Sequence, residues 1–444
     1  MRRAMIPLLA VLAGAAGGQT PRAPLALSLK RAVEIAISPE GNANIQLAAE
    51  SLKQAQARTL ESRAALLPDV ESSVAYESRT TNLAAMGIRF SLPPSIPISI
   101  PTFVGPFTTF DARLTASQSI FDFSSIRRFQ ASKSGLAAAR KDVENADEQV
   151  AASVARAYLA AIKADADLDS AEANVKLSQA LLQQSNNQKT AGTGTGIEIT
   201  RAKVQLANDQ QHLLTAQNAR RSAHLRLLRA MGASLETEVE LTDKLGYVPV
   251  DAVTLEQAKT QALAARPDYQ AQREREATAR LSASATKLER VPSLTAFGDY
   301  GSIGTGPDAA LPTRTYGISL RVPLFDGGKR DARREESASQ YRAERVRSND
   351  LKEQIELDVR LALDALQSAD AEVKVAKDGL ELAQNELAQA RRRYDAGVAI
   401  SVEVTDAQTR LERALDNQTA ALYGFNVAKI DLAQSLGKVR STVQ

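Results

Sequence analysis

The chain has 444 residues, of which 4% are aromatic, and it contains no tryptophan and no cysteine. The absence of cysteine excludes disulfides, thiolate metal sites and a lipidated cysteine. The formal net charge is +3 with both signs interleaved, which argues against a nucleic-acid partner and indicates solvated helix faces. Alanine, glutamine, leucine and charged residues dominate, a composition typical of long helices rather than of two or three globular domains.

The N-terminus has the three parts of a secretory signal peptide. Residues 1–3 carry two arginines, residues 4–15 are mostly apolar, and residues 16–18 are small. We therefore predict a signal peptide over 1–18, cleaved before Gln19, in preference to a short buried helix. Elsewhere no run of 18 apolar residues occurs, so the sequence predicts no transmembrane helix.

The first of two predicted repeats covers residues 19–232. Short helices are expected over 29–67, because Pro68 ends the helical spacing of apolar residues. A β-hairpin is expected over 70–121, with a long proline-rich loop between its strands. The second strand, from Phe107, alternates apolar and polar residues over about the length that a tilted strand needs to cross a bilayer.

A long helix is predicted over 124–189, which contains no proline. Apolar residues recur every seven positions from Val154 to Leu182, and such a stripe stays against a neighbour only in a left-handed supercoil. As one helix this segment would reach roughly 99 Å at about 1.5 Å per residue. A glycine-rich turn follows, and a return helix over 198–231 is expected to end at Gly232 as its C′ residue.

The same pattern restarts after a linker or equatorial segment over 233–253. Gly232 and Gly437 close the two copies and lie 437 − 232 = 205 positions apart. A second repeat is therefore predicted over 254–437. Its expected elements are helices over 254–291, a β-hairpin over 293–325, a long helix over 330–394 and a return helix over 402–436, followed by a C-terminal tail at 438–444.

The two hairpins supply too few strands to enter a membrane alone. An open sheet edge in lipid leaves backbone groups unpaired, and a closed barrel needs about eight strands or more. If the hairpins span a membrane, a homotrimer would supply 3 × 4 = 12 strands and bury the apolar stripes of six long helices. The alternative is a small soluble β-layer on a coiled coil.

Several motifs resemble the TolC family of outer-membrane efflux proteins in this order and spacing. They are SIFDF at 119–123, TAGTGTGIEIT at 190–200, ARPDYQ at 265–270, PLFDGG at 323–328 and RYDAGVAISVEVTDAQ at 393–408. The resemblance implies a mainly α fold with a small β part: a trimeric transmembrane β-barrel in the outer membrane of a Gram-negative envelope, continuing into a coiled-coil α-helical barrel in the periplasm.

The resemblance also implies function and partners. Members act as passive exit ducts in tripartite efflux or secretion systems, exporting small molecules or other cargo, with a periplasmic adaptor protein, an inner-membrane pump and outer-membrane lipid as partners. The turns at Gly192, Gly194 and Gly397 lie farthest from the strands, so they would form the periplasmic mouth and the adaptor-docking surface. The alternative function is an exported coiled-coil structural or adhesion protein, or a periplasmic adaptor.

Three acidic residues and one tyrosine are candidates for the mouth itself. Glu403 and Asp406 share a helix face, and Glu198 is the repeat partner of Glu403, since 403 − 198 = 205. In a trimer such carboxylates would attract cations at a constriction, whereas the alternative is a solvated acidic pair at a helix N-terminus. The resemblance implies that Tyr394 bonds to the neighbouring hairpin and keeps the mouth closed, although Tyr394 also continues the apolar stripe and could simply be packed.

Basic residues near the second turn are interpreted more conservatively. The family often has a basic residue two positions after the turn glycine, where this chain has Ala399, so no basic–acidic latch is predicted there. Arg391, Arg392 and Arg393 are interpreted as partners of the helix dipole.

No catalytic, cofactor or metal site is predicted. His212 and His224 are the only histidines, and twelve residues of helix place them roughly 120° apart in azimuth, which suits no shared metal. The glycine-rich turn lacks the Gly-Lys-Ser/Thr ending of a phosphate-binding loop. The sequence therefore predicts that the protein is not an enzyme.

Overall fold

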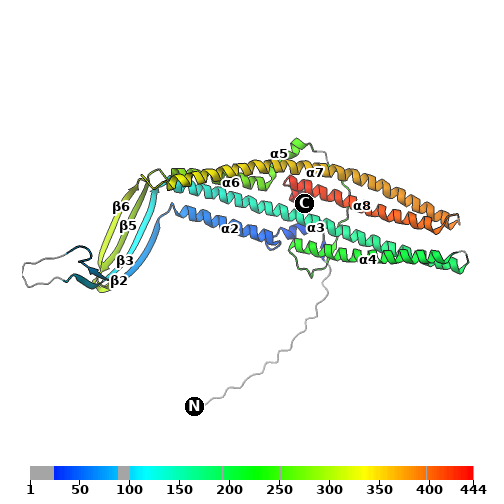
Figure 1. Ribbon diagram of the computed structural model, residues 1–444, viewed down its shortest axis with the longest axis horizontal. Coiled ribbons are helices and arrows are strands. Elements are labelled where there is room, and N and C mark those ends of the chain that lie inside the picture. Colours follow the sequence, from blue (N-terminus) through cyan, green and yellow to red (C-terminus); the bar gives the residue numbers. More distant parts are fainter. Residues whose placement is uncertain (1–24, 89–100, 193, 251–252, 397, 444) are drawn as a thin grey trace, which may run out of the picture.

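The computed structural model describes residues 25–88, 101–192, 194–250, 253–396 and 398–443. The predicted signal peptide and most of the proline-rich loop lie outside these residues, as does Gly397. The chain is elongated, with one antiparallel sheet at one end and two helix–helix turns at the other (Figure 1). Within the described residues, no helix is both long enough and apolar enough to cross a membrane.

The two hairpins join into a single four-stranded sheet with the order β2-β3-β5-β6. Strands β3 and β5 pair across the repeats, so β2 and β6 form its two edges. The strands are β2 (Asp69–Asn82), β3 (Phe103–Phe121), β5 (Ser293–Gly304) and β6 (Leu311–Arg321).

Two strand boundaries differ from the sequence prediction. Strand β3 begins four residues earlier than predicted and includes Pro106. Pro106 lies beside the register shift between Arg79 and Thr81, where its missing N–H interrupts no regular ladder. Strand β6 ends at Arg321 instead of continuing to Phe325, because Pro323 cannot donate to the ladder.

The sheet has one apolar and one polar face. Antiparallel partners share a face, so the register assigns each side chain to one of them. On the polar face, Arg113 pairs with Asp111 at 2.6 Å and with Asp299 at 3.6 Å. The other face presents exposed large apolar side chains from all four strands: Val70, Val74, Tyr76, Leu114, Tyr300, Tyr316, Ile318 and Leu320.

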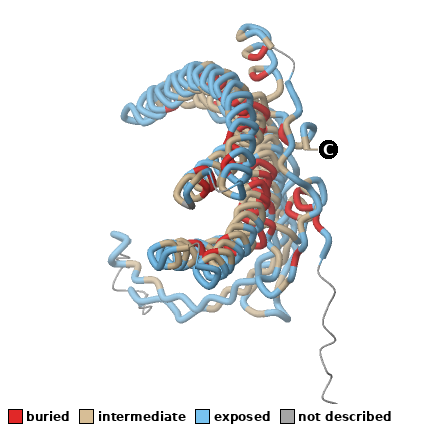
Figure 2. Tube along the Cα trace, turned by 90° about the vertical axis from the view of Figure 1, so that its right-hand side faces the viewer, coloured by how far each residue is buried: buried red, intermediate tan, exposed pale blue. Residues whose placement is uncertain are grey.

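Two long helical hairpins extend from the sheet. The absence of proline lets each long helix run unbroken for 67 or 68 residues, close to the predicted limits. Viewed end on, the helices form a curved wall with buried residues along its middle (Figure 2). The hairpins are α3 (Phe123–Thr190) with α4 (Gly196–Met231), and α7 (Lys329–Asp395) with α8 (Ser401–Ser435).

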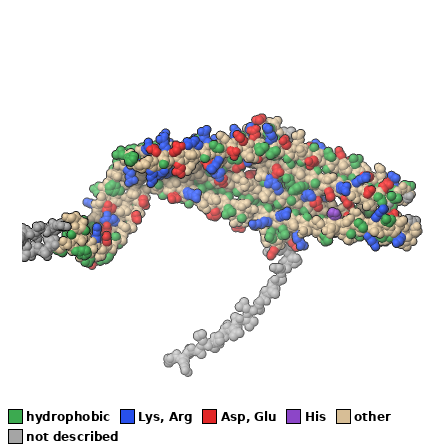
Figure 3. Space-filling model, in the orientation of Figure 1, with side chains coloured by type: hydrophobic (Ala, Val, Ile, Leu, Met, Phe, Trp, Pro, Cys, Tyr) green, Lys and Arg blue, Asp and Glu red, His purple; other side chains and the backbone are tan. Residues whose placement is uncertain are grey.

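Shorter helices flank the long helices α3 and α7 over the half of their length that is nearest the sheet. Helix α2 (Ala43–Ala64) packs on α3, and α6 (Pro267–Leu288) packs between α3 and α7. Lys/Arg and Asp/Glu side chains alternate along these surfaces, as the low net charge predicted (Figure 3).

The largest buried cluster lies at mid-length, where α1 (Leu29–Ala36) packs against α3 and α4. Tyr158 is fully buried there, and its hydroxyl donates to the carbonyl oxygen of Leu27 at 2.8 Å. Three elements of this region were not predicted from the sequence. They are the parallel pair β1 (Leu25–Leu27) and β4 (Val239–Leu241), and helix α9 (Val439–Val443), which occupies the expected C-terminal tail.

Each repeat closes on a glycine that packs against the junction of its own short helices. Gly232 has φ +74°, and a Cβ there would lie 2.6 Å from the carbonyl oxygen of Gly41, between α1 and α2. Gly437 has φ +68°, and a Cβ there would lie 2.8 Å from Cα of Arg266, between α5 (Leu255–Ala265) and α6. Only glycine combines this backbone conformation with so close an approach.

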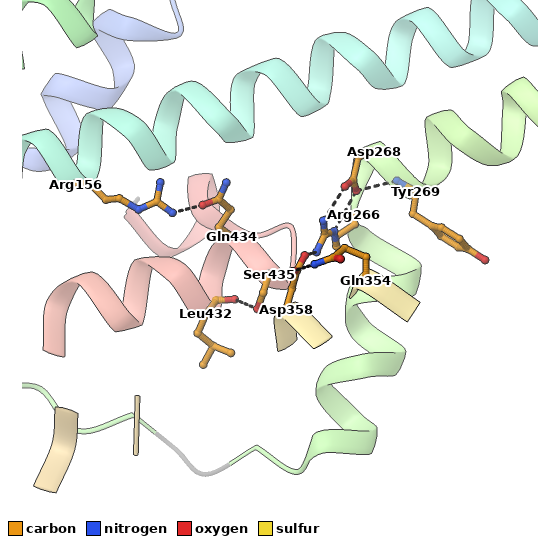
Figure 4. Close-up of polar contacts among 9 residues, drawn as sticks. All are labelled: Arg156, Arg266, Asp268, Tyr269, Gln354, Asp358, Leu432, Gln434 and Ser435. Atoms are coloured by element: carbon orange, nitrogen blue, oxygen red, sulfur yellow. Dashed lines mark hydrogen bonds and ion pairs between the residues drawn. The ribbon is translucent and has the colours of Figure 1, made fainter. Parts of the chain in front are cut away.

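The second of these junctions is fixed by the ARPDYQ segment (Figure 4). The Arg266 guanidinium donates to Asp268 at 2.7 Å and to Asp358 of α7 at 2.9 Å. These contacts attach the start of α6 to the middle of α7.

Candidate functional site at the hairpin tips

The two helix–helix turns lie side by side at the end of the molecule opposite the sheet (Figure 1). We call this end, residues 188–201 and 393–406, the mouth. Gly192 has φ +74°, and a Cβ on Gly194 would lie 2.9 Å from the backbone nitrogen of Lys189, so the first turn requires both glycines. Helix α4 then begins with a capping box, in which Glu198 accepts from the Thr195 N–H at 2.9 Å.

Tyr394 connects the two helical hairpins, α3 with α4 and α7 with α8, within one chain. Its hydroxyl donates to Oε1 of Gln188, at the end of α3, with a distance of 2.5 Å. Its ring packs against the small apolar cluster formed by Leu387, Ala390, Val404 and Ala407. Tyr394 is therefore both packed and hydrogen-bonded to the other helical hairpin, and its role in closing the mouth stays a prediction.

Glu403 and Asp406 have different surroundings although they share a helix face. Glu403 forms an ion pair with Arg393 of α7 at 3.0 Å, which partly neutralises its charge. Asp406 is exposed, and no ion pair of its carboxylate is found among the described residues. Arg393 was interpreted only as a dipole partner, because sequence spacing does not show which side chains meet across a turn.

A cavity of about 270 Å³ lies between the two hairpins at the mouth. Three of the predicted site residues line it: Glu198, Tyr394 and Asp406. Arg201 contributes a positive charge that the sequence reasoning did not single out. Glu403 does not line the cavity, so the structure separates it from the other three.

The two histidines lie away from the mouth contacts. His224 Nε2 is 2.9 Å from Oδ1 of Asp165, which also accepts from Arg220 at 2.6 Å. In the part of the chain that the structure describes, no group of three or more His, Cys, Asp or Glu residues could hold a metal ion.

The chain matches the family described as "Outer membrane efflux protein" at residues 38–233 and 259–438. It is 26% identical over 414 residues to the pyoverdine export outer membrane protein OpmQ of Pseudomonas putida, covering 91% of this chain and 84% of OpmQ. It is 21% identical over 330 residues to the alkaline protease secretion protein AprF of Pseudomonas aeruginosa, covering 72% of this chain and 68% of AprF.

Solved structures agree with the fold. The outer membrane channel CmeC of Campylobacter jejuni superposes with a TM-score of 0.80 at 17% identity, covering 92% of this chain and 85% of CmeC. The family match spans both repeats, which favours the efflux channel over the alternative of a coiled-coil adhesion protein or an adaptor. The family predicted from the sequence motifs is confirmed: the chain belongs to the outer membrane efflux protein (TolC) family and is a non-enzymatic outer-membrane export channel.

Proposed function

We propose that three copies of the chain assemble into one closed duct. The observation that carries the proposal is the two-faced sheet with edges at β2 and β6. An exposed apolar face suits lipid. However, each backbone N–H or C=O group left unpaired at a sheet edge in lipid costs several kcal/mol. Joining β6 of one copy to β2 of the next removes every edge and gives 3 × 4 = 12 strands around a polar interior.

The outer helices support the same arrangement. Helix α7 runs along one edge of the chain, and α2 and α4 run along the other (Figure 1). Both edges expose large apolar residues that an isolated chain would leave in water. On α7 these are Val346, Leu357, Leu361, Val375 and Leu382, and on the opposite edge they are Leu47, Leu60, Val204 and Leu214. We propose that these two stripes meet between neighbouring copies.

The duct would work as a passive conduit. Residues 1–18 act as the signal peptide that directs the chain out of the cytoplasm. The sheets span the outer membrane, and the long helical hairpins extend into the periplasm. A periplasmic adaptor binds the turns at Gly192, Gly194 and Gly397, and an inner-membrane pump supplies the energy. Tyr394 holds the mouth closed, while Asp406, with smaller contributions from Glu198 and Glu403, favours cations. The similarity to a pyoverdine export protein supports a small-molecule cargo.

A pair of adjacent substitutions in β3 tests this proposal. Leu114 lies on the apolar face and Thr115 on the polar face. Leu114→Lys places a charge in lipid at a cost of about 2–4 kcal/mol near the midplane, whereas Thr115→Lys faces the interior. We expect the first variant to lose trimer insertion into the outer-membrane fraction and the second to retain it, with trimer mass measured in detergent. Equal insertion of both variants, or a folded monomer in water without detergent, would refute the proposal.

A further inference from the structure

A buried polar seam lies between the two hairpins, next to the mouth cavity. Its members are Ser178 of α3, Asp209 of α4, and Gln408 and Glu412 of α8. Ser178, Asp209 and Gln408 are only 1%, 4% and 3% exposed. Polar groups buried this deeply usually have hydrogen-bond partners, so the pairing within the seam shows what it can bind.

Asp209 has donors for both of its oxygens. The Ser178 hydroxyl donates to Oδ2, and the Gln205 amide donates to Oδ1 at 3.0 Å. Both side-chain oxygens of Asp209 thus accept hydrogen bonds, one from α3 and one from its own helix.

Glu412 has no such support. Its Oε1 is buried and, among the described residues, has no hydrogen-bond partner. Gln408, one helical turn earlier, likewise leaves both its amide oxygen and its amide nitrogen buried without partners. The seam therefore contains a second carboxyl group and an amide, and both have buried polar atoms without hydrogen-bond partners among the described residues.

The charges around Glu412 are acidic. Asp209 faces it from α4, and Asp416 lies one turn further along α8. From α7, the uncharged Leu387 and Ala390 pack against this part of α8, and Glu386 forms an ion pair with Arg410, two residues before Glu412. Burial and these two carboxylates raise the pKa of Glu412 to about 7. Burial and Asp167 of α3 also raise the pKa of Asp416, opposed by Lys163 of α3 and His212 of α4.

We propose that Glu412 is a proton-binding site that couples the two hairpins. With the proton bound, Glu412 is neutral and no charge repulsion opposes the packing of α8 on α3. Without the proton, the partly buried carboxylate of Glu412 is repelled by the buried carboxylate of Asp209 on the first helical hairpin. The second hairpin then separates from the first, and the mouth opens.

The direction of the pH dependence follows from the raised pKa. The packed state binds the proton more tightly than the separated state, in which the carboxyl regains its ordinary value of 4.5. Packing is therefore fully stabilised below about pH 4.5, and this stabilisation is lost as the pH rises through about 7. One proton per chain changes the opening equilibrium by at most about tenfold per pH unit.

The inference rests on the proposed duct, and it is tested by single-channel recordings between pH 5.5 and 8.5. We expect the open probability of the wild-type trimer to rise with pH. Glu412→Gln, which imitates the protonated acid, should stay closed and lose the pH dependence. Glu386→Gln is the matched control, because this exposed carboxylate is paired with Arg410 on the same hairpin and should leave the wild-type profile unchanged.

A second variant and a second measurement test the role of Glu412 even if Glu412→Gln does not assemble or conduct. Asp209→Asn removes the opposing charge and should reduce the rise in open probability with pH. Hydrogen exchange of the amides of α8 around Glu412, corrected for the intrinsic pH effect, should show the wild-type dependence on pH without requiring conduction. A wild-type profile in Glu412→Gln, or a conducting wild-type channel that is insensitive to pH, would overturn the inference. Absence of any channel would instead count against the proposed duct.

Discussion

Replacing Tyr394 with phenylalanine should make the mouth open more readily. The substitution removes one hydroxyl that donates to Gln188 of the other hairpin at 2.5 Å. It retains the ring that packs on Leu387, Ala390 and Val404. A neutral hydrogen bond contributes about 1 kcal/mol net, or about fivefold in an equilibrium constant. In a trimer whose hairpins move together, three such losses amount to about 3 kcal/mol, or roughly 150-fold.

Single-channel recording of purified trimers measures this change directly as open probability at fixed pH. Tyr247→Phe is the matched control, because its hydroxyl donates to Asp370 at 2.6 Å but lies away from the mouth. We expect Tyr394→Phe to raise the open probability between about fivefold and 150-fold, depending on how tightly the three copies are coupled, and Tyr247→Phe to leave it unchanged. An intact Tyr394→Phe trimer with wild-type gating would refute the reasoning.

Two other substitutions test the mouth charge and the glycine contacts. Asp406→Asn should reduce cation preference, measured by reversal potential, more than Glu403→Gln, because Arg393 already pairs with Glu403 at 3.0 Å. Equal effects would show that the ion pair does not form in the channel. Gly232→Ala should lower stability by about 1–3 kcal/mol, because its φ is +74° and a Cβ would lie 2.6 Å from the Gly41 oxygen. Gly379→Ala on α7 meets no atom within 4 Å and should raise stability by about 0.5–1 kcal/mol, so thermal unfolding that orders these two variants differently would contradict the assignment.

The sequence predicted the long elements well and the short ones poorly. An uninterrupted heptad stripe without proline predicts a helix from 124 to 189, and the structure extends it by a single residue at each end. Strands β1 and β4 have only three residues each, too few for any periodic pattern. They form because Tyr158 and the surrounding core hold them in place, and such tertiary contacts leave no local signal.

The sequence predicted which residues of the two repeats correspond at the candidate site, but it did not predict which side chains lie close together. The offset of 205 relates Glu198 to Glu403, but the structure brings Glu198 to Asp406 and Tyr394 and turns Glu403 toward Arg393. The roles of these residues at the mouth stay predictions. Asp209 and Glu412 look like any other acidic residues on charged helices, and only their burial distinguishes them.

The distribution of buried residues gives the rod unequal stiffness along its length. The mid-length cluster joins α1, α3, α4, α8 and α9 around Tyr158. Among the described residues, the cluster nearest the turns has only four buried members: Leu387, Ala390, Val404 and Ala407. The mid-length region can thus serve as a fixed pivot for the last turns of α7 and the first turns of α8. A partner that binds the tips would bend them outward with little work, while the sheet at the other end stays undisturbed.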